Sequence, residues 1–378
     1  MEGIVLALFI CVVLALVTKY LSVPAIPFYI VAGLVLGNAG LGIVASDAIS
    51  HFFSEMGLIF LLFFMGLGLK IERIAANRSA VLTTGIIDLN VNMIIGFVAS
   101  YLLGFTLVES LIVASAFYIS STAMALTSLI ENRKLMMKEA DTIIWLMVFE
   151  DFVLIIFLAL ISAGDQNLII FAVKILFVLG ILYALAHYGK EFLISILDRD
   201  DELPILFTFA AVLTTASFSM YLGVPETMMV IALGAAFATT DPDAFEQHAR
   251  PFKDVFLVVF FVFFGVTMDL SGGVNLFVIA IICILAIVSK LISGILTGIF
   301  IHGSALSGIE IWGNTIGRGE FSIALAVLYG SPIVGTTIAA MVIVTSIFGA
   351  FTAKYATSLR RGIVHLGRRS APPRRIHR

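Results

Sequence analysis

The chain has 378 residues, of which 61% are hydrophobic and 12% are charged, and its formal net charge is -3. Soluble globular proteins are about 45 to 50% apolar and about 25% charged, so this composition excludes a soluble protein and predicts a polytopic membrane protein. The two cysteines, Cys11 and Cys283, lie in apolar runs far apart in the sequence. Neither a disulfide framework nor a metal cluster is therefore expected, and we expect no nucleic-acid partner.

Apolar runs long enough to cross a bilayer recur along the whole chain. Crossing about 30 Å of hydrocarbon takes about 17 to 25 apolar residues at ~1.5 Å per residue. The first run lacks the basic start of a secretory signal, so we expect it to be a retained helix. The sequence predicts thirteen helices, at approximately 3–20, 24–43, 51–69, 80–103, 107–129, 141–163, 167–188, 204–221, 225–240, 252–269, 273–300, 309–329 and 335–356.

Basic residues fall in every second loop between these runs, apart from a neutral loop near His302 where a basic one is expected. Cytoplasmic loops carry the excess of Lys and Arg, so the alternation predicts an external N-terminus and a cytoplasmic C-terminus in the cytoplasmic membrane. The basic segment 358–378 is predicted to be a cytoplasmic tail attracted to anionic lipid. The basic loop residues are Lys19, Lys70, Arg73, Arg78, Arg133, Lys134, Lys138, Lys190, Arg199, Arg250 and Lys253.

A few charged residues lie within the predicted helices instead of the loops. A charge at the bilayer centre costs at least ~2.5 kcal/mol on insertion scales, so such residues are expected to pair with one another or to face a polar cavity. Several of them, of both signs, fall near the predicted midplane. The set comprises Asp88, Glu150, Asp151, Lys174, Lys290, Arg318 and Glu320.

Two of the predicted helices contain polar breaks. The fifth contains YISSTA at 118–123, and the twelfth contains GNTIGRGEFS at 313–322. Polar, glycine-containing breaks at corresponding places in two halves indicate the ion site of a secondary transporter. An odd offset of seven helices makes the two repeats inverted, and it matches the helix of Asp88 to the helix of Lys290.

The predicted organisation is an all-α membrane protein with two inverted repeats and two unwound crossing helices. The first repeat spans 1–163, a linker helix with a cytoplasmic loop spans 164–203, and the second repeat spans 204–357.

Each of these features also has a purely structural interpretation. Hydroxyl-rich segments and GxxxG spacings, such as Gly33 with Gly37 and Gly294 with Gly298, occur in ordinary helix packing. Asp88, with Asn92 one turn away, is compatible with a buried structural hydrogen bond. Lys174 on the linker helix is expected to extend toward the interface or to form a structural pair.

Five segments carry a resemblance to a known family. HFFSEMGLIFLLFFMGLGLKIERI, ISSTAMA, FEDF, PFKDVFLVVFFVFFGVTMDL and GRGEFSIAL resemble, in order, conserved parts of the monovalent cation:proton antiporter superfamily. The likeness covers nearly the whole chain and is greatest to the Kef-type branch without a fused regulatory domain. It implies an inverted-repeat fold with a core domain against a dimerisation domain, and a homodimer in the lipid bilayer.

By this resemblance, Asp151 binds an alkali ion and a proton in turn, with Ser120, Ser121 and Thr122 near the crossing. Lys290 matches a basic residue that can pair with an acid at Glu150. The chain departs from the family where it has Gly68 in the third helix. It also has Glu150 where Kef proteins have Gln, and Arg318 where they have no Arg.

The expected function is exchange of K⁺ or Na⁺ for protons, because one carboxylate cannot hold a proton and an alkali ion together. Glu150 is expected to pair with either Lys290 or Arg318, with Glu320 and Asp88 in supporting roles. No cofactor is expected beyond the transported ions. A gated cation channel is the alternative, although no TVGYG filter occurs, and the sequence lacks HExxH and GxSxG enzyme motifs. A separate cytoplasmic regulatory subunit is a further expected partner.

Overall fold

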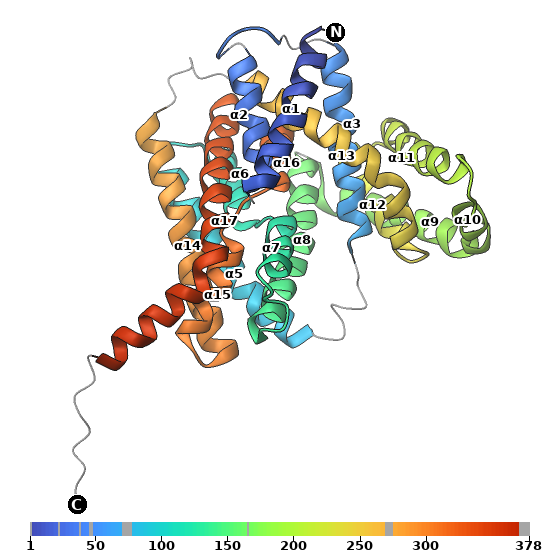
Figure 1. Cartoon of the computed structure of the whole chain (residues 1–378). Helices are drawn as coiled ribbons and strands as arrows, with labels where there is room; N and C mark the ends of the chain where they lie inside the picture. Colours follow the sequence, from blue (N-terminus) through green and yellow to red (C-terminus); the bar gives the residue numbers. More distant parts are fainter. Residues whose placement is uncertain are drawn as a thin grey trace, which may run out of the picture. The chain divides into compact units, whose positions relative to one another are not determined.

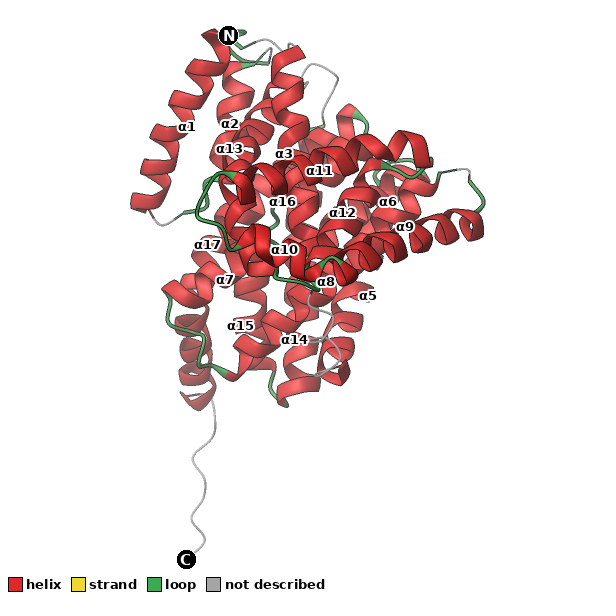
Figure 2. Ribbon diagram, turned by 90° about the vertical axis from the view of Figure 1, so that its right-hand side faces the viewer, coloured by secondary structure: helices red, strands yellow, loops and turns green. Residues whose placement is uncertain are grey.

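The computed structural model describes residues 2–21, 23–37, 39–44, 48–69, 78–164, 166–268 and 275–369, and the regular structure of these ranges is entirely helical (Figures 1 and 2). Lys70, Arg73 and tail residues 370–378 lie outside the described residues. The helices are α1 (Glu2–Leu21), α2 (Ile26–Leu36), α3 (Ala48–Leu67), α5 (Arg78–Leu102), α6 (Leu107–Tyr118), α7 (Thr122–Glu131), α8 (Lys138–Ala163), α9 (Leu168–Tyr188), α10 (Lys190–Leu197), α11 (Leu203–Leu222), α12 (Glu226–Phe237), α13 (Pro242–Thr267), α14 (Leu276–His302), α15 (Ala305–Thr315), α16 (Glu320–Tyr329) and α17 (Pro332–Arg369).

Every predicted run contains helix in the structure, and the two runs with polar breaks are each divided into two helices. The fifth run is divided into α6 and α7, and the twelfth into α15 and α16. Within the described ranges, 8 spans are long and apolar enough to cross a membrane. The chain is thus an all-α polytopic membrane protein with two interrupted helices, as predicted.

Two boundaries differ from the sequence expectation. Helix α13 begins at Pro242, so Arg250 and Lys253 lie on a helix and not in the expected loop. Pro251 is inside this helix, nine residues after its start, and the surrounding first turns are polar. Helix α17 continues to Arg369, beyond the predicted end at 356, so the first part of the expected tail is helical.

The order of the helices repeats along the chain. Helices α1, α2 and α3 begin at Glu2, Ile26 and Ala48, and α11, α12 and α13 begin at Leu203, Glu226 and Pro242. The starts of each corresponding pair are separated by a nearly constant number of residues. The same separation relates α5 to α14, α6 to α15, α7 to α16 and α8 to α17. A break in one half therefore has a counterpart in the other.

The helices group into two compact units that each take segments from both halves of the sequence. The first unit is Met1–Arg78, Val148–Val274 and Ile323–Ala339, and the second is Ser79–Met147, Asn275–Ser322 and Ala340–Arg378. The chain passes from one unit to the other inside α8, α16 and α17. The repeat boundaries expected at 163, 204 and 357 concern the sequence halves, and they stay a prediction.

Glycines let four helices of the first unit approach backbone to backbone. A Cβ at Gly33 on α2 would lie 1.9 Å from the Val262 carbonyl oxygen of α13, and one at Gly66 on α3 would lie 2.1 Å from the Ile231 carbonyl oxygen of α12. No real Cβ tolerates such distances, so only glycine fits. Gly265 and Gly234 are the facing glycines on the partner helices.

Helices α14 and α15 make a similar contact in the second unit. A Cβ at Gly298 would lie 2.3 Å from the Gly308 amide nitrogen, and one at Gly308 would lie 2.5 Å from the Gly294 carbonyl oxygen. The predicted GxxxG spacing of Gly294 and Gly298 is thus a packing motif, as is that of Gly33 and Gly37 against α13.

We expect Gly66→Ala to lower the stability of the protein by roughly 1 to 3 kcal/mol, because the new methyl group forces α3 away from α12. The matched control is Gly180→Ala on α9, where a Cβ meets nothing within 4 Å. That change is expected to be neutral or to stabilise, since alanine favours a helix over glycine by about 1 kcal/mol. Melting temperatures in detergent, read by size-exclusion chromatography, compare the two, and equal values would contradict the close-contact argument.

Candidate functional site

The two interrupted helices are joined directly at their breaks. The Ser121 amide donates to the Gly317 carbonyl oxygen at 2.7 Å. The Ser120 hydroxyl donates to the Thr315 carbonyl oxygen at 2.9 Å. From the other side, the Ser322 hydroxyl donates to the Ala116 carbonyl oxygen at 3.1 Å. The break residues therefore satisfy one another's backbone groups, which lipid cannot do.

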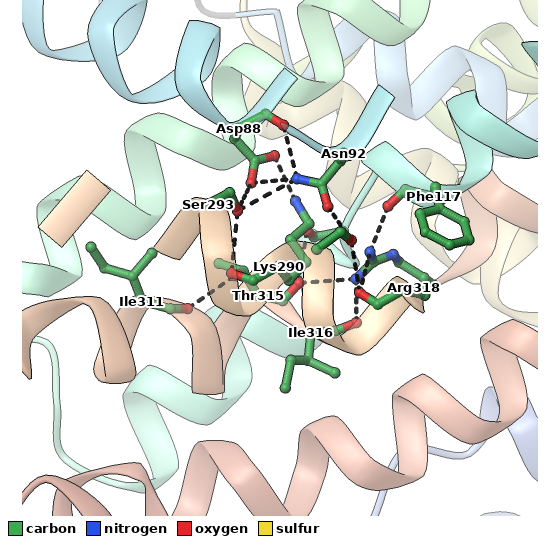
Figure 3. Close-up of polar contacts among 12 residues, drawn as sticks. Asp88, Asn92, Phe117, Lys290, Ser293, Ile311, Thr315, Ile316 and Arg318 are labelled. Atoms are coloured by element: carbon green, nitrogen blue, oxygen red, sulfur yellow. Dashed lines mark hydrogen bonds and ion pairs between the residues drawn. The ribbon is translucent and has the colours of Figure 1, made fainter. Parts of the chain in front are cut away.

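Arg318 places a positive charge beside the C-terminal ends of α6 and α15, the helices that precede the two breaks (Figure 3). Its side chain is fully buried. One terminal nitrogen donates to the carbonyl oxygens of Ile316 at 2.5 Å and Thr315 at 3.5 Å. The other donates to the carbonyl oxygens of Phe117 at 2.5 Å and Ala286 at 3.2 Å.

Three of these four carbonyls belong to the C-terminal ends of helices, at Phe117 in α6 and at Thr315 and Ile316 around the end of α15. The last carbonyls of a helix have no partner within the helix and carry about half a negative charge. A guanidinium, with five donors and a permanent charge, suits this position better than any other side chain. Arg318 thus compensates the ends of both half-helices at once.

An acidic residue, Glu320, lies at the N-terminal ends of the helices that follow the two breaks, α7 and α16. Glu320 is the first residue of α16, and Ser121 is the N-cap of α7, where its hydroxyl accepts from the Met124 amide. The Ser121 hydroxyl also donates to Glu320 Oε2 at 3.4 Å. Helix N-termini carry partial positive charge, so a carboxylate there is favourable. Arg318 and Glu320, two residues apart, thus match opposite dipole ends at one crossing.

Asp88 and Lys290 form a buried ion pair between α5 and α14. Lys290 Nζ lies 2.6 Å from Asp88 Oδ2, and the two side chains are 0% and 1% exposed. The other carboxylate oxygen, Oδ1, accepts from Asn92 Nδ2 at 2.8 Å and from the Ser293 hydroxyl at 2.6 Å. The helix count matches α5 to α14 as corresponding helices of the two halves, but the sequence did not predict this ion pair.

Glu150 and Asp151 belong to α8 in the first unit, just after the chain enters it at Val148. Glu150 is buried at 1% exposure, whereas Asp151 is partly exposed. Successive residues of a helix point about 100° apart, so neighbouring carboxylates have different surroundings. Of the two, Asp151 is the less buried. The pairing of Glu150 with Lys290 or Arg318 stays a prediction.

Sequence reasoning found most of the charged groups but missed the polar residues around them. Ser289 and Ser293 flank Lys290 on an otherwise apolar helix, and this local polarity is the signal that could have revealed them. It also missed a second buried ion pair. Lys134, predicted as a loop charge, lies 2.9 Å from Glu310 Oε2 and donates to the Ala353 carbonyl oxygen at 2.6 Å.

The structure places the remaining predicted residues as follows. Ser120, Ser121, Arg318 and Glu320 lie together at the crossing in the second unit. Thr122 starts α7, and its hydroxyl oxygen is buried with no hydrogen-bond partner in the described part of the chain. Among the described residues, no cluster of His, Cys, Asp and Glu could hold a metal ion in the manner of a resident cofactor.

Comparison with known proteins identifies the family. Residues 5–356 match the family described as "Sodium/hydrogen exchanger, transmembrane". The chain belongs to this family. It is 29% identical to the K(+)/H(+) antiporter subunit KhtU of Bacillus subtilis, over 85% of this chain and 83% of that protein. It is 23% identical to the ammonium/H(+) antiporter subunit AmhT of Alkalihalophilus pseudofirmus, over 90% of this chain and 88% of that protein.

A solved structure has the same fold. The sodium proton antiporter MjNhaP1 from Methanocaldococcus jannaschii aligns with a TM-score of 0.72 at 18% identity, covering 96% of this chain and 98% of that one. This likeness concerns the fold. The family match, with the antiporter relatives, confirms the predicted membership of the monovalent cation:proton antiporter superfamily, and the chain is a membrane cation/proton antiporter.

We expect Arg318→Gln to destabilise the protein by at least ~3 kcal/mol, because it leaves several buried carbonyls without a charged donor. Arg250→Gln is the control, since Arg250 on α13 has an exposed side chain whose i,i+4 pair with Glu246 is worth little. Thermal unfolding in detergent, followed by loss of the monodisperse peak, measures both. A melting temperature for Arg318→Gln as high as that of the control would contradict the role of Arg318 at the helix ends.

Proposed function

We propose that this protein exchanges K⁺ or Na⁺ for protons across the cytoplasmic membrane by alternating access, and that the cation and the proton compete for Asp151. The observation that carries the proposal is the pair of interrupted helices, bonded to each other and charge-compensated by Arg318 and Glu320. Such breaks place hydroxyl oxygens and backbone carbonyls outside regular helix bonding in a membrane protein, where a dehydrated ion needs oxygen ligands.

The proton and the cation compete because either one neutralises the negative charge of the same carboxylate. An ionised carboxylate inside a membrane is costly, and either one proton or one alkali ion removes that cost. If the protein changes its access only when the carboxylate is neutralised, each proton that leaves must be replaced by a cation. The partial exposure of Asp151, beside the buried Glu150, supports Asp151 as the exchanging group.

The ligands proposed for the cation are oxygens. Alkali ions are hard cations, for which carboxylate, hydroxyl and carbonyl oxygens are the suitable protein ligands, as they are for Ca²⁺ and Mg²⁺. Ser120, Ser121 and Thr122 supply hydroxyls at the break before α7. The buried Thr122 hydroxyl, which lacks a partner in the described structure, is the strongest of these candidates.

The relatives support a monovalent cation as substrate. Their names describe exchange of K⁺, ammonium or Na⁺ for protons, and all three cations carry one charge. The choice for this chain is between K⁺ and Na⁺. Purified protein in liposomes with an internal pH dye, challenged with each alkali ion in turn, tests both the exchange and the choice. Single-channel cation currents, with no coupled proton movement, would overturn the proposal in favour of a gated channel.

The two compact units are the parts that we propose to move. The chain passes between them inside α8, next to Glu150 and Asp151, and again inside α16 and α17. A change in the position of one unit against the other would switch the access of Asp151 between the two sides of the membrane. We further propose a homodimer, with the N-terminus outside and the C-terminus in the cytoplasm, as the alternation of basic loops predicts.

Asp151→Asn is expected to abolish exchange and leave the amount of folded protein unchanged, because it removes the titrating oxygen and keeps the volume of the side chain. Glu150→Gln is the matched neighbour, and it is expected to retain part of the activity. Dye-detected proton flux in liposomes measures both variants. Proton flux in Asp151→Asn at the wild-type rate, with the same cation dependence, would refute Asp151 as the shared site.

We also propose that a separate cytoplasmic subunit regulates exchange through the end of α17. Arg360 is held at 2.9 Å from Glu139 of α8, while the neighbouring Arg361 is exposed and available to an acidic partner. The names of two relatives describe each as an antiporter subunit, which supports this proposal.

The proposed subunit should co-migrate with the antiporter when the protein is purified from its native membranes. Reversal of charge at the end of α17, in an Arg361→Glu variant, is expected to weaken that association, because an acidic partner would then face a like charge. Quantification of co-purified protein against the same preparation of Arg250→Glu provides the comparison. Equal recovery of lipid alone from both preparations would exclude the subunit in favour of membrane binding.

A further inference from the structure

We propose that residues 132–138, which connect α7 to α8, form with the end of α17 a docking surface for an acidic cytoplasmic protein, and that this surface transmits docking to α8. The inference rests on the regulatory subunit of the proposed function. It adds the place where that subunit binds and the contacts through which binding reaches the helix of Asp151.

Arg133 has a backbone conformation that favours glycine. Its φ is +55°, and among the described residues no other residue except glycine has a positive φ. The Arg133 amide donates to the Ile130 carbonyl oxygen at 3.1 Å, and the Lys134 amide donates to the Leu129 carbonyl oxygen at 2.7 Å. These two bonds are the Schellman arrangement that ends a helix, in which the position of Arg133 is usually glycine. A strained arginine at this position points to a function of its side chain.

The Arg133 side chain is exposed, and two further basic residues are exposed around it. Lys138 is the first residue of α8, and Arg361 lies near the end of α17. Between Arg133 and Lys138 the chain exposes two apolar side chains, Leu135 at 47% and Met136 at 96%. Arginine and methionine are enriched in the surfaces with which proteins bind one another. The composition of this surface therefore fits a protein partner.

Two contacts fix the connection to α17. Lys134 Nζ donates to the Ala353 carbonyl oxygen at 2.6 Å, and Arg360 Nη1 lies 2.9 Å from Glu139 Oε1. Ala353 and Arg360 are two turns apart on α17, so the connection runs along the last turns of this helix. Arg361 follows Arg360 directly. Helix α17 thus brings a third basic residue to the start of α8.

The same contacts give docking a route to the exchange site. Glu139 is 2% exposed and lies in the first turn of α8, the helix that carries Asp151. Close to this turn, the Thr142 hydroxyl and His302 Nε2 of α14 are 2.9 Å apart, so the start of α8 is held from two sides. A partner that displaces the end of α17 would displace the first turn of α8 through Arg360. The continuous helix would carry this change to Asp151.

Acidic residues at the edge of the surface favour a protein over anionic lipid. Glu131 at the end of α7 and Asp141 in the first turn of α8 are both exposed. An anionic bilayer surface would repel both carboxylates, whereas a folded protein can place acidic groups opposite the basic residues alone. The partner is expected to be acidic where it meets Arg133, Lys138 and Arg361, and apolar between them.

The first test uses inside-out vesicles from native cells, whose outer surface is the cytoplasmic face of the membrane. A wash at high salt releases proteins that are held by charge. Exchange is read by pH dye before the wash, after it, and after the extract is returned in the assay buffer. The wash is expected to change the rate of the wild-type protein, and the extract to restore it. A rate that the wash leaves unchanged would overturn the regulatory subunit of the proposed function, and this inference with it, while the proposed exchange at Asp151 would stand.

The second test separates docking from folding by Arg133→Gly. Glycine relieves the strained φ, so the melting temperature of the purified variant should equal or exceed that of wild type. Restoring the rate should need at least ~10-fold more extract, because a charge that faces the acidic partner is lost. Lys138→Glu should have the same effect on docking, and Lys190→Glu, at an exposed position at the start of α10, is the matched control. Wild-type behaviour of both Arg133→Gly and Lys138→Glu toward the extract would refute the docking surface and leave the subunit intact.

The third test concerns transmission. Glu139→Gln should bind the released protein as wild type does, measured by co-sedimentation with washed vesicles, but its exchange rate should no longer respond. A full response of the rate in this variant would exclude the route through Arg360 and Glu139.

The lipid alternative is tested with purified protein in phosphatidylcholine liposomes, with and without phosphatidylglycerol. Equal exchange rates are expected in the two lipids. A rate that depends on the anionic lipid in wild type and not in Arg133→Gly would overturn the inference in favour of lipid binding.

Discussion

Interrupting two helices within a membrane leaves backbone carbonyls and amides that lipid cannot satisfy, and the remainder of this site depends on how they are paired. Each unsatisfied group costs several kcal/mol in hydrocarbon. The Arg318 guanidinium satisfies carbonyls at the ends of both α6 and α15, because it donates hydrogen bonds at both breaks. The direct bonds of Ser120 and Ser121 to the opposite break satisfy further groups.

The charges of the second unit form a connected system around these breaks. Arg318 and Glu320 match the dipole ends of the half-helices, while Asp88 and Lys290 neutralise each other between α5 and α14. Each of these charged side chains has a partner that offsets part of its desolvation cost. The fold therefore does not require any of them to bind or release a transported ion. This separates the structural charges from Asp151 on α8, to which we assign the exchange.

Backbone contacts through glycine hold helices of the first unit together, as they do for α14 and α15 in the second. Helices α2 and α13, like α3 and α12, approach so closely that a methyl group has no space. Without a hydrophobic force between helices in lipid, close packing of small residues is a main source of association. Helix α2 corresponds to α12 and α3 corresponds to α13 in the two halves, so the α2–α13 and α3–α12 contacts are equivalent and the packing follows the repeat.

The sequence by itself determined the class of the protein, the approximate positions of its helices and the two breaks. It could do so because membrane helices need long apolar runs and because polar, glycine-rich interruptions stand out within them. The resemblance of FEDF and GRGEFSIAL to a family is the basis for the predicted role of Asp151 and pointed to the second crossing segment. Only the tertiary structure decided which groups touch. It paired Lys290 with Asp88, directed Arg318 to backbone carbonyls and buried Lys134 against Glu310. These contacts join residues far apart in the chain, and a sequence does not reveal them because several opposite charges at one depth can pair equally well until helix rotation and packing select the partners.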